Sequence, residues 1–193
     1  MNISGSTNYV NESFKDLNIE QTPLRNASFV GCAFIKCRLS RVDFTGADFS
    51  DCTFERCELS LPVLVKCGLH DTTFKECKLI GADFSKCNIN FFHISFTGCL
   101  IDTCNFSGLK LKHTPFIACT IRESRFNETV LTEATFEGSD LENTLFHQCD
   151  LEKADFSRAR NYSIDLTANK VKGAMFSLPE AVSLLANLGI DLR

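Results

Sequence analysis

The sequence predicts an all-β solenoid, a coil of short strands that turns a corner every five residues. Bulky apolar residues recur every five positions, and all eleven cysteines occupy one position of this repeat, two residues before a bulky one. A period of five suits neither a helix, with about 3.6 residues per turn, nor a flat strand, which alternates with a period of two. The 193 residues fit a single domain.

We call the bulky residue of each repeat its centre. Centres run at a spacing of five from Phe14 to Ile89 and resume at Phe96, after two extra residues. Steps of twenty residues, with allowance for those two, give a column made of phenylalanine alone: Phe14, Phe34, Phe54, Phe74, Phe96, Phe116, Phe136, Phe156 and Phe176. The neighbouring column is aliphatic from Ile19 to Leu141. A repeat of twenty predicts four sides per coil, with like residues stacked about 4.8 Å apart.

The cysteines are predicted to be small, buried wall residues rather than ligands or nucleophiles. They are Cys32, Cys37, Cys52, Cys57, Cys67, Cys77, Cys87, Cys99, Cys104, Cys119 and Cys149. Four sides converge on a narrow interior, where cysteine packs as a small hydrophobe. An odd cysteine count argues against a disulfide framework and favours a reducing cytoplasm. No signal peptide is recognisable, and no apolar run approaches the roughly 20 residues of a membrane span, so a membrane partner is not expected.

The repeats share a small residue, a polar residue and a bulky residue, as in Ala47-Asp48-Phe49 and Ala154-Asp155-Phe156. This pattern resembles the pentapeptide repeat family, whose motif is A(D/N)LXX. The resemblance covers about residues 14 to 176 and implies a right-handed quadrilateral β-helix. The four sides follow from the repeat of twenty, whereas the handedness comes from the resemblance.

Three parts of the chain are expected: a flexible N-terminal tail at 1–11, the β-helix at 12–176, and a capping or dimerisation segment at 177–193. Ser177-Leu178-Pro179-Glu180 resembles a capping box and predicts a short α-helix from about Leu178 to Leu188, ended by Gly189. The apolar candidates for a cap or dimer contact are Leu178, Val182, Leu184, Leu185, Leu188 and Ile190. One apolar face would cover the open end of the solenoid. The resemblance favours a homodimer through a second face, and simple capping is the alternative.

The two extra residues lie between Asn90 and Ser95. They form either a bulge that restores the register or a small protruding contact made by Phe91, Phe92 and His93. The second interpretation rests on the frequent use of exposed aromatic residues as anchors at interfaces.

The sequence contains no recognisable catalytic constellation. Its four histidines are dispersed, and His70 and His147 each follow a centre, where a solvated surface position is expected. No phosphate loop is present, and the cysteine spacing does not match a zinc knuckle. We therefore expect neither an enzyme nor a bound cofactor or metal.

The net charge of −4 is unevenly distributed, with nine acidic and three basic residues between Thr120 and Phe156. The candidate acidic partner surface consists of Glu123, Glu128, Glu133, Glu137, Asp140 and Glu142. Residues twenty apart should stack on neighbouring coils, which predicts an Asp102–Arg122–Glu142 ladder and a Glu133–Lys153 pair. An ordinary solvated acidic surface is the alternative interpretation.

The resemblance also implies a function. Qnr-type members of the family are dimeric acidic rods that imitate duplex DNA, bind DNA gyrase or topoisomerase IV, and protect against quinolones. A rod with anionic rows suits a basic DNA-binding saddle, and no direct nucleic acid binding is expected. The alternative is a general scaffold or regulatory module for another protein partner. This sequence departs from many Qnr-type proteins in its mild charge and in having only the two-residue insertion.

Overall fold

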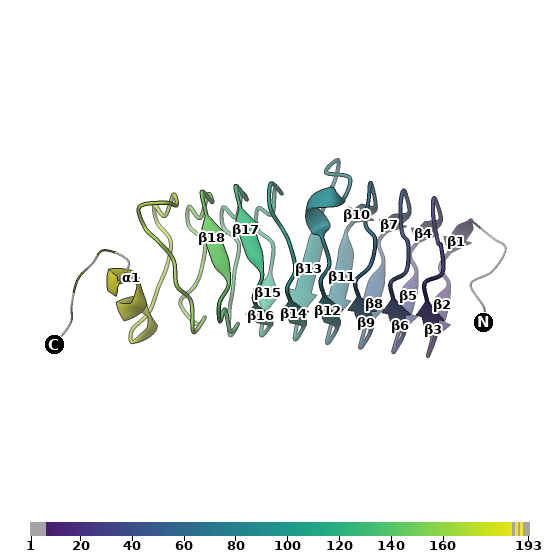
Figure 1. Ribbon diagram of the computed structural model, residues 1–193, viewed down its shortest axis with the longest axis horizontal. Helices are drawn as coiled ribbons and strands as arrows, with labels where there is room; N and C mark the ends of the chain where they lie inside the picture. The colour runs from purple at the N-terminus through teal and green to yellow at the C-terminus, as the bar shows by residue number, and fades with distance from the viewer. Residues whose placement is uncertain (1–6, 187, 189, 191–193) are drawn as a thin grey trace.

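The computed structural model describes residues 7–186, 188 and 190, and shows a rod of stacked coils with β1 at one end and α1 at the other (Figure 1). The strands in chain order are β1 (Asn8–Val10), β2 (Ser13–Lys15), β3 (Asn18–Glu20), β4 (Ser28–Val30), β5 (Ala33–Ile35), β6 (Arg38–Ser40), β7 (Asp48–Ser50), β8 (Thr53–Glu55), β9 (Glu58–Ser60), β10 (Gly68–His70), β11 (Thr72–Lys75), β12 (Lys78–Ile80), β13 (Ile94–Thr97), β14 (Leu100–Asp102), β15 (Phe116–Ile117), β16 (Thr120–Arg122), β17 (Arg125–Asn127) and β18 (Leu145–His147). The helical segments are η1 (Phe84–Lys86), η2 (Glu180–Val182) and α1 (Ser183–Ala186).

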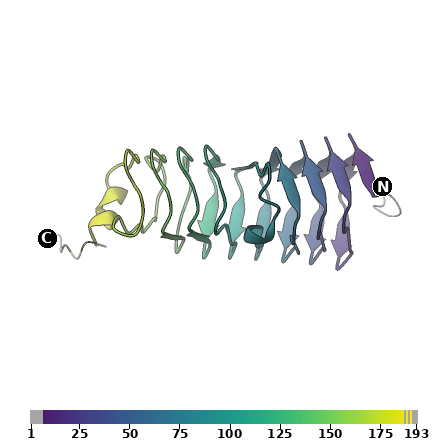
Figure 2. The ribbon, with the colours of Figure 1, turned by 90° about the horizontal axis from the view of Figure 1, so that it is seen from above.

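All strand pairs are parallel and join residues of successive coils. The first side of the rod carries β1, β4, β7 and β10; the second carries β2, β5, β8, β11, β13 and β15; the third carries β3, β6, β9, β12, β14 and β16. The fourth side carries β17 and β18 and is otherwise held by isolated bridges such as Pro23↔Asp43. Viewed from above, the coils succeed one another along a straight axis (Figure 2).

The register is the one that the repeat of twenty predicts. Phe14 pairs with Phe34, and Phe34 with Phe54, whereas Phe74 pairs with Phe96 because the insertion lengthens that coil by two residues. The nine phenylalanine rings of the second side stack face to face, with centroids 4.6 to 5.3 Å apart. Rings of adjacent sides meet edge to face, as Phe106 does with Phe116 at 5.9 Å. Both arrangements are favoured by the aromatic quadrupole.

All eleven cysteines are buried and free. One column of cysteines lies at the corner between the second and third sides of the rod. In this column the backbone N–H of Cys37 donates to Sγ of Cys57 at 3.3 Å, and the N–H of Cys57 donates to Sγ of Cys77 at 3.4 Å. The thiols also donate to backbone carbonyls inside the rod; Cys57 reaches the carbonyl of Phe34 at 3.2 Å. Where the small residue is a cysteine or a serine, it can therefore supply a hydrogen bond as well as a small volume. Ser139 makes the same contact with the carbonyl of Phe116 at 2.8 Å.

One boundary and one inward position differ from the expectation. The solenoid begins at Asn8, inside the segment 1–11 expected to be a tail, because Tyr9 acts as a centre and stacks on Phe29 at 4.9 Å. Residues 1–6 lie outside the described part of the chain. The prediction that Ile89 is a centre is also wrong, since its side chain is 65% exposed. Phe92 is half-buried against the core instead, because the insertion turns the chain outward at Ile89 before the register returns at Ile94.

The predicted helix from Leu178 to Leu188 is too long. The structure has η2 followed by the single turn of α1, and the cap of η2 is Pro179, without a side-chain hydrogen bond. The Ser177 hydroxyl bonds the carbonyl of Ser157 on the preceding coil instead of the helix start. The capping box therefore does not form, and the helix begins later than expected. Gly189, the expected helix end, lies outside the described residues.

Candidate interaction surfaces

The outward positions of each repeat are the residues on either side of the centre and the corner residue that follows. The corner residues adopt the left-handed region: Glu123 has φ of 49°, Glu128 of 53° and Glu133 of 58°. Because these three are five residues apart, they occupy three successive corners and point away from different edges of the rod. Glu137 follows the centre of the second side, while Asp140 and Glu142 flank a centre of the third. The six acidic candidates are thus distributed around the rod.

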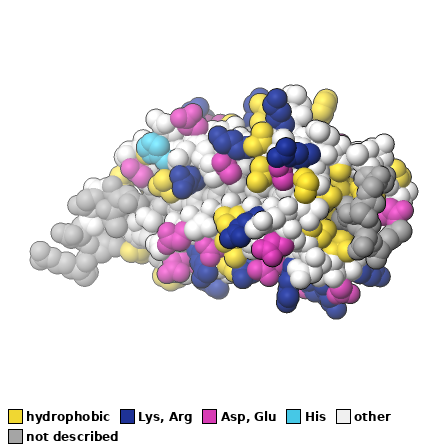
Figure 3. Space-filling view, turned by 45° about the vertical axis from the view of Figure 1, so that its right-hand side comes forward, with side chains coloured by type: hydrophobic (Ala, Val, Ile, Leu, Met, Phe, Trp, Pro, Cys, Tyr) yellow, Lys and Arg dark blue, Asp and Glu magenta, His cyan; other side chains and the backbone are white. Residues whose placement is uncertain are grey.

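Half of the acidic candidates form ion pairs with cations of the next coil. Glu133 lies 3.3 Å from Nζ of Lys153, Glu137 lies 2.7 Å from Arg158, and Asp140 lies 3.0 Å from Arg160. Basic and acidic side chains are accordingly intermixed on the face shown in Figure 3. Neutralisation by paired cations leaves less net negative potential than the count of acids alone suggests.

The predicted charge ladder forms in part. Arg122 donates to Asp102 at 2.7 Å, whereas Glu142 makes no ion pair with another described residue. At Asp140, burial acts to raise the pKa, but hydrogen bonds from Asn161 and Arg160 outweigh it and hold the pKa below the usual aspartate value. These exposed ion pairs contribute little to the stability of the fold, because solvent screens such contacts.

The insertion forms a loop that rises from the rod above β10, seen in teal at the top of Figure 1. Phe91 at its tip is 88% exposed, and Phe92 packs inward. His93 is exposed and its Nδ1 lies 2.7 Å from the Asp71 carboxylate. The three candidate residues therefore face different ways, and Phe91 and Ile89 supply the exposed apolar surface.

The C-terminal candidates also divide into two groups. Leu184 is buried in the core and Leu185 is half-buried. The Ser183 hydroxyl donates to the carbonyl of Tyr162 at 2.9 Å. Leu178 is 79% exposed, and the other exposed apolar candidates are Val182, Leu188 and Ile190. The segment thus covers the end of the solenoid and leaves apolar side chains facing outward.

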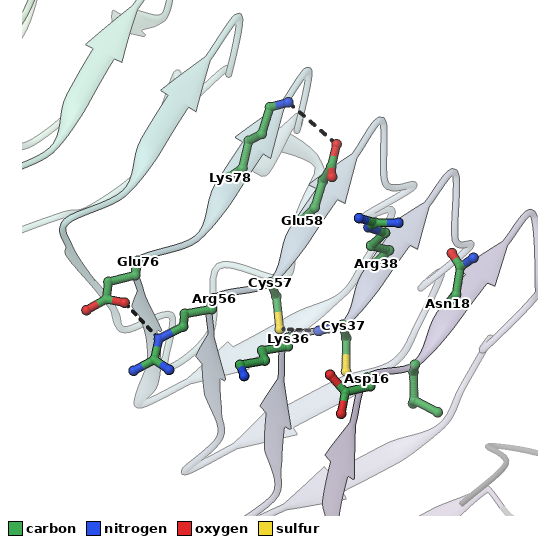
Figure 4. A pocket seen from close by; sticks show the side chains of 11 residues that line it. Asp16, Asn18, Lys36, Cys37, Arg38, Arg56, Cys57, Glu58, Glu76 and Lys78 are labelled. Carbon is green, nitrogen blue, oxygen red and sulfur yellow. Dashed lines mark hydrogen bonds and ion pairs between the residues drawn. The ribbon is translucent and has the colours of Figure 1, made fainter.

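A groove of about 550 Å³ runs along the corner between the second and third sides (Figure 4). Cys37 and Cys57 lie at its floor, between two rows of polar side chains. These rows are Asp16, Lys36, Arg56 and Glu76 on one side, and Asn18, Arg38, Glu58 and Lys78 on the other. Arg56 is paired with Glu76 at 2.9 Å and Lys78 with Glu58 at 3.6 Å. Lys36 and Arg38 have no ion-pair partner in the described part of the chain, so the groove presents two adjacent free cations.

Three of the buried thiols are held in the protonated form. Burial raises the pKa of the Cys52, Cys87 and Cys104 thiols to about 12, so each is held as the unreactive thiol at neutral pH. Within residues 7–186, no group of three or more His, Cys, Asp or Glu side chains is placed to hold a metal ion. No helix in the same part is long and apolar enough to span a bilayer.

Comparisons with known proteins identify the family. The profile of the pentapeptide repeat region matches residues 27–106, 67–146 and 89–166. The chain belongs to the pentapeptide repeat family. Its fold is the right-handed quadrilateral β-helix of that family. No significant match is found among curated protein sequences.

Two solved pentapeptide-repeat structures show the likeness in three dimensions. A trypsin-treated variant of QnrB1, a plasmid-mediated fluoroquinolone resistance protein, superposes with a TM-score of 0.72 at 17% identity, covering 96% of this chain and 99% of the trypsin-treated chain. HetL, involved in heterocyst differentiation regulation in the cyanobacterium Nostoc sp. strain PCC 7120, gives 0.51 at 15% identity, covering 90% and 89% of the two chains. At these identities the likeness concerns the fold alone.

Proposed function

We propose that this pentapeptide-repeat protein is a non-catalytic rod that binds DNA gyrase or topoisomerase IV and protects it from, or modulates, poisons such as quinolones. The observation that carries the proposal is the match to QnrB1 along nearly the whole of both chains. Buried cysteines and a surface formed by short strands and corners also favour binding over catalysis. Free thiols suit a reducing compartment, and we propose that the protein is cytoplasmic.

The acidic C-terminal half is the proposed contact with the topoisomerase. Among its candidate acids, Glu128 and Glu142 have no ion-pair partner within the described residues, so their charge is available to a basic groove. A rod with unpaired carboxylates on its surface would present these charges to a DNA-binding saddle. We further propose a homodimer through the exposed apolar residues Leu178 and Val182, which would double the length of the rod.

A supercoiling assay tests the proposal. Purified protein added to gyrase at micromolar concentration should inhibit supercoiling or restore it in the presence of a fluoroquinolone. The double variant Glu128→Lys and Glu142→Lys should lose the effect. The control variant Glu20→Lys, which follows a third-side centre at the opposite end of the rod as Glu142 does, should keep it. If wild-type protein neither inhibits nor rescues gyrase and topoisomerase IV, the topoisomerase proposal fails.

The dimer has its own test. Light scattering should give twice the monomer mass for the wild type and the monomer mass for Leu178→Asp. Val30→Asp, an exposed valine of β4 near the other end, should leave the mass unchanged. A monomer mass for the wild type at high concentration would contradict the dimer.

A specific observation favours a second candidate, a scaffold or regulatory module for a different protein. The acidic candidates lie on several sides of the rod and half of them are ion-paired, whereas DNA mimicry requires continuous anionic rows. The apolar loop tip and the free cations Lys36 and Arg38 suit an acidic partner with an apolar pocket. Binding that is lost in Phe91→Ala but kept in Glu128→Lys would favour this candidate.

A further inference from the structure

One histidine connects the insertion loop to the strands beneath it. The Nε2 atom of His70 on β10 lies 2.8 Å from a carboxylate oxygen of Asp48 on β7, and its Nδ1 lies 3.0 Å from the carbonyl oxygen of Phe91 at the loop tip. The His70 side chain is only 23% exposed. Both neighbours are hydrogen-bond acceptors, and a neutral imidazole carries a single N–H. Only the imidazolium donates to both.

Gly68 provides a second, independent sign that this contact is built into the fold. It pairs with Asp48 across the strands, and its φ lies outside the left-handed region, so the backbone does not require glycine there. A Cβ at this position would collide with the Asp48 carboxylate and would lie 2.8 Å from Nε2 of His70. The absence of a side chain at Gly68 therefore leaves the space in which Asp48 and His70 pair.

Among the described residues, few charged groups lie near His70 and the loop. Asp48 faces it from β7, and the Phe91 ring lies 6.4 Å from the imidazole in an edge-to-face arrangement. Asp71, the next residue in the chain, is bound to His93 at the far end of the loop. The loop is thus attached through one histidine at its tip and another at its end, and the backbone N–H of His93 also donates to the carbonyl of Leu69 at 2.9 Å.

We propose that His70 is a pH-sensitive latch that holds the loop tip when it is charged and releases it when it is neutral. An imidazole changes its charge between about pH 5 and 8, whereas a carboxylate stays ionised over that range. When the proton leaves to solvent, the remaining N–H stays on Nε2, because a bare Nε2 lone pair would face the Asp48 carboxylate. The Nδ1 lone pair then faces the carbonyl oxygen of Phe91, and that contact is lost.

Loss of this hydrogen bond acts directly on the loop tip. Phe91 has a φ of 56°, the left-handed conformation that the corner residues of the rod share. Without the hydrogen bond to His70, the carbonyl of Phe91 is no longer held against β10. The inference goes beyond the proposed function: the loop tip is a contact only in the second candidate function, and the latch itself needs no partner.

The sequence contains no tryptophan, so the variant Phe91→Trp places the one tryptophan of the chain at the loop tip. Acrylamide quenching of this variant, followed from about pH 5 to about pH 8.5, should rise in one transition within the range of imidazole titration. The same background with His70→Gln should show no transition. Added His93→Gln or His147→Gln should leave the transition in place, which assigns it to His70.

Three results would overturn the latch: a flat titration of Phe91→Trp, a transition that survives His70→Gln, or a transition abolished by His93→Gln alone. If His70→Gln does not fold, Asp48→Asn in the same background takes its place. Removing the carboxylate allows the neutral ring to carry its N–H on Nδ1 and to keep the contact with Phe91, so the transition should be lost. An unchanged transition would contradict the latch. A flat titration leaves the topoisomerase proposal standing, and a negative supercoiling assay leaves the latch standing.

Discussion

Phe116 lies in the middle of the phenylalanine stack, and its replacement by alanine tests how the rod is stabilised. The ring is fully buried and stacks on Phe96 at 5.1 Å and on Phe136 at 5.0 Å. It also meets Phe106 and Phe126 edge to face at 5.9 and 5.7 Å. A core phenylalanine replaced by alanine usually costs about 3–5 kcal/mol of unfolding free energy. Each aromatic contact contributes roughly 0.5–1.5 kcal/mol beyond burial.

We therefore expect Phe116→Ala to lose free energy in the upper half of that range. Four ring contacts disappear together, and each coil is supported only by its neighbours. Phe176→Ala is the matched control, since Phe176 belongs to the same column but is half-buried and has a stacking neighbour on one side only. Its loss should be about 1–2 kcal/mol.

Equilibrium urea unfolding followed by circular dichroism measures both variants against the wild type. A loss below about 1 kcal/mol for Phe116→Ala would contradict its place in the core. Equal losses for the two variants would contradict the argument that stacking on both sides determines the cost.

Three further predictions concern the small residues and the charges. Ser139→Ala should cost about 1–3 kcal/mol in the same urea assay, because its hydroxyl serves both the carbonyl of Phe116 and the N–H of Cys119, at 2.8 and 2.9 Å; a neutral result would show that these groups find other partners. Native protein at pH 8 should resist a thiol reagent such as DTNB, while the urea-unfolded chain should release eleven equivalents, and rapid native labelling would contradict the buried thiols. Asp140 has a lowered folded-state pKa, so its stabilising contribution is present above the usual aspartate pKa of about 3.9 and is lost as the pH falls through the lower value. The stability difference between wild type and Asp140→Asn should shrink from about pH 5 to about pH 2, and a difference that grows on acidification would contradict this sign.

The periodicity of the sequence predicts most of the fold. A spacing of twenty between like residues was sufficient to predict the sides, the stacking and the cysteine column, because each inward position has the same environment in every coil. The prediction failed at Ile89, where counting by five places an apolar residue inside. Three apolar residues near the insertion, Ile89, Phe91 and Phe92, could fill the one inward position. The sequence does not show which of them does, because this depends on the path of the backbone through the insertion.

The surface was predicted less well, for a geometric reason. Glu123, Glu128 and Glu133 are close in sequence and were grouped as one acidic surface. A spacing of five places them at successive corners, so only residues twenty apart share a face, and that rule was available in the sequence. The pairing of His70 with Asp48 and Phe91 was not predictable, because it depends on the path of the insertion and on the space left at Gly68.

The repeat of twenty means that distances along the rod are set in whole coils. The insertion loop and the C-terminal segment are separated by about four coils, or roughly 19 Å. Removing or duplicating twenty residues between Phe116 and Phe136 would keep every column in register and change that separation by about 4.8 Å. The spacing between two contact points can therefore vary only in whole coils, and a partner that engages both points would accept some rod lengths and reject others.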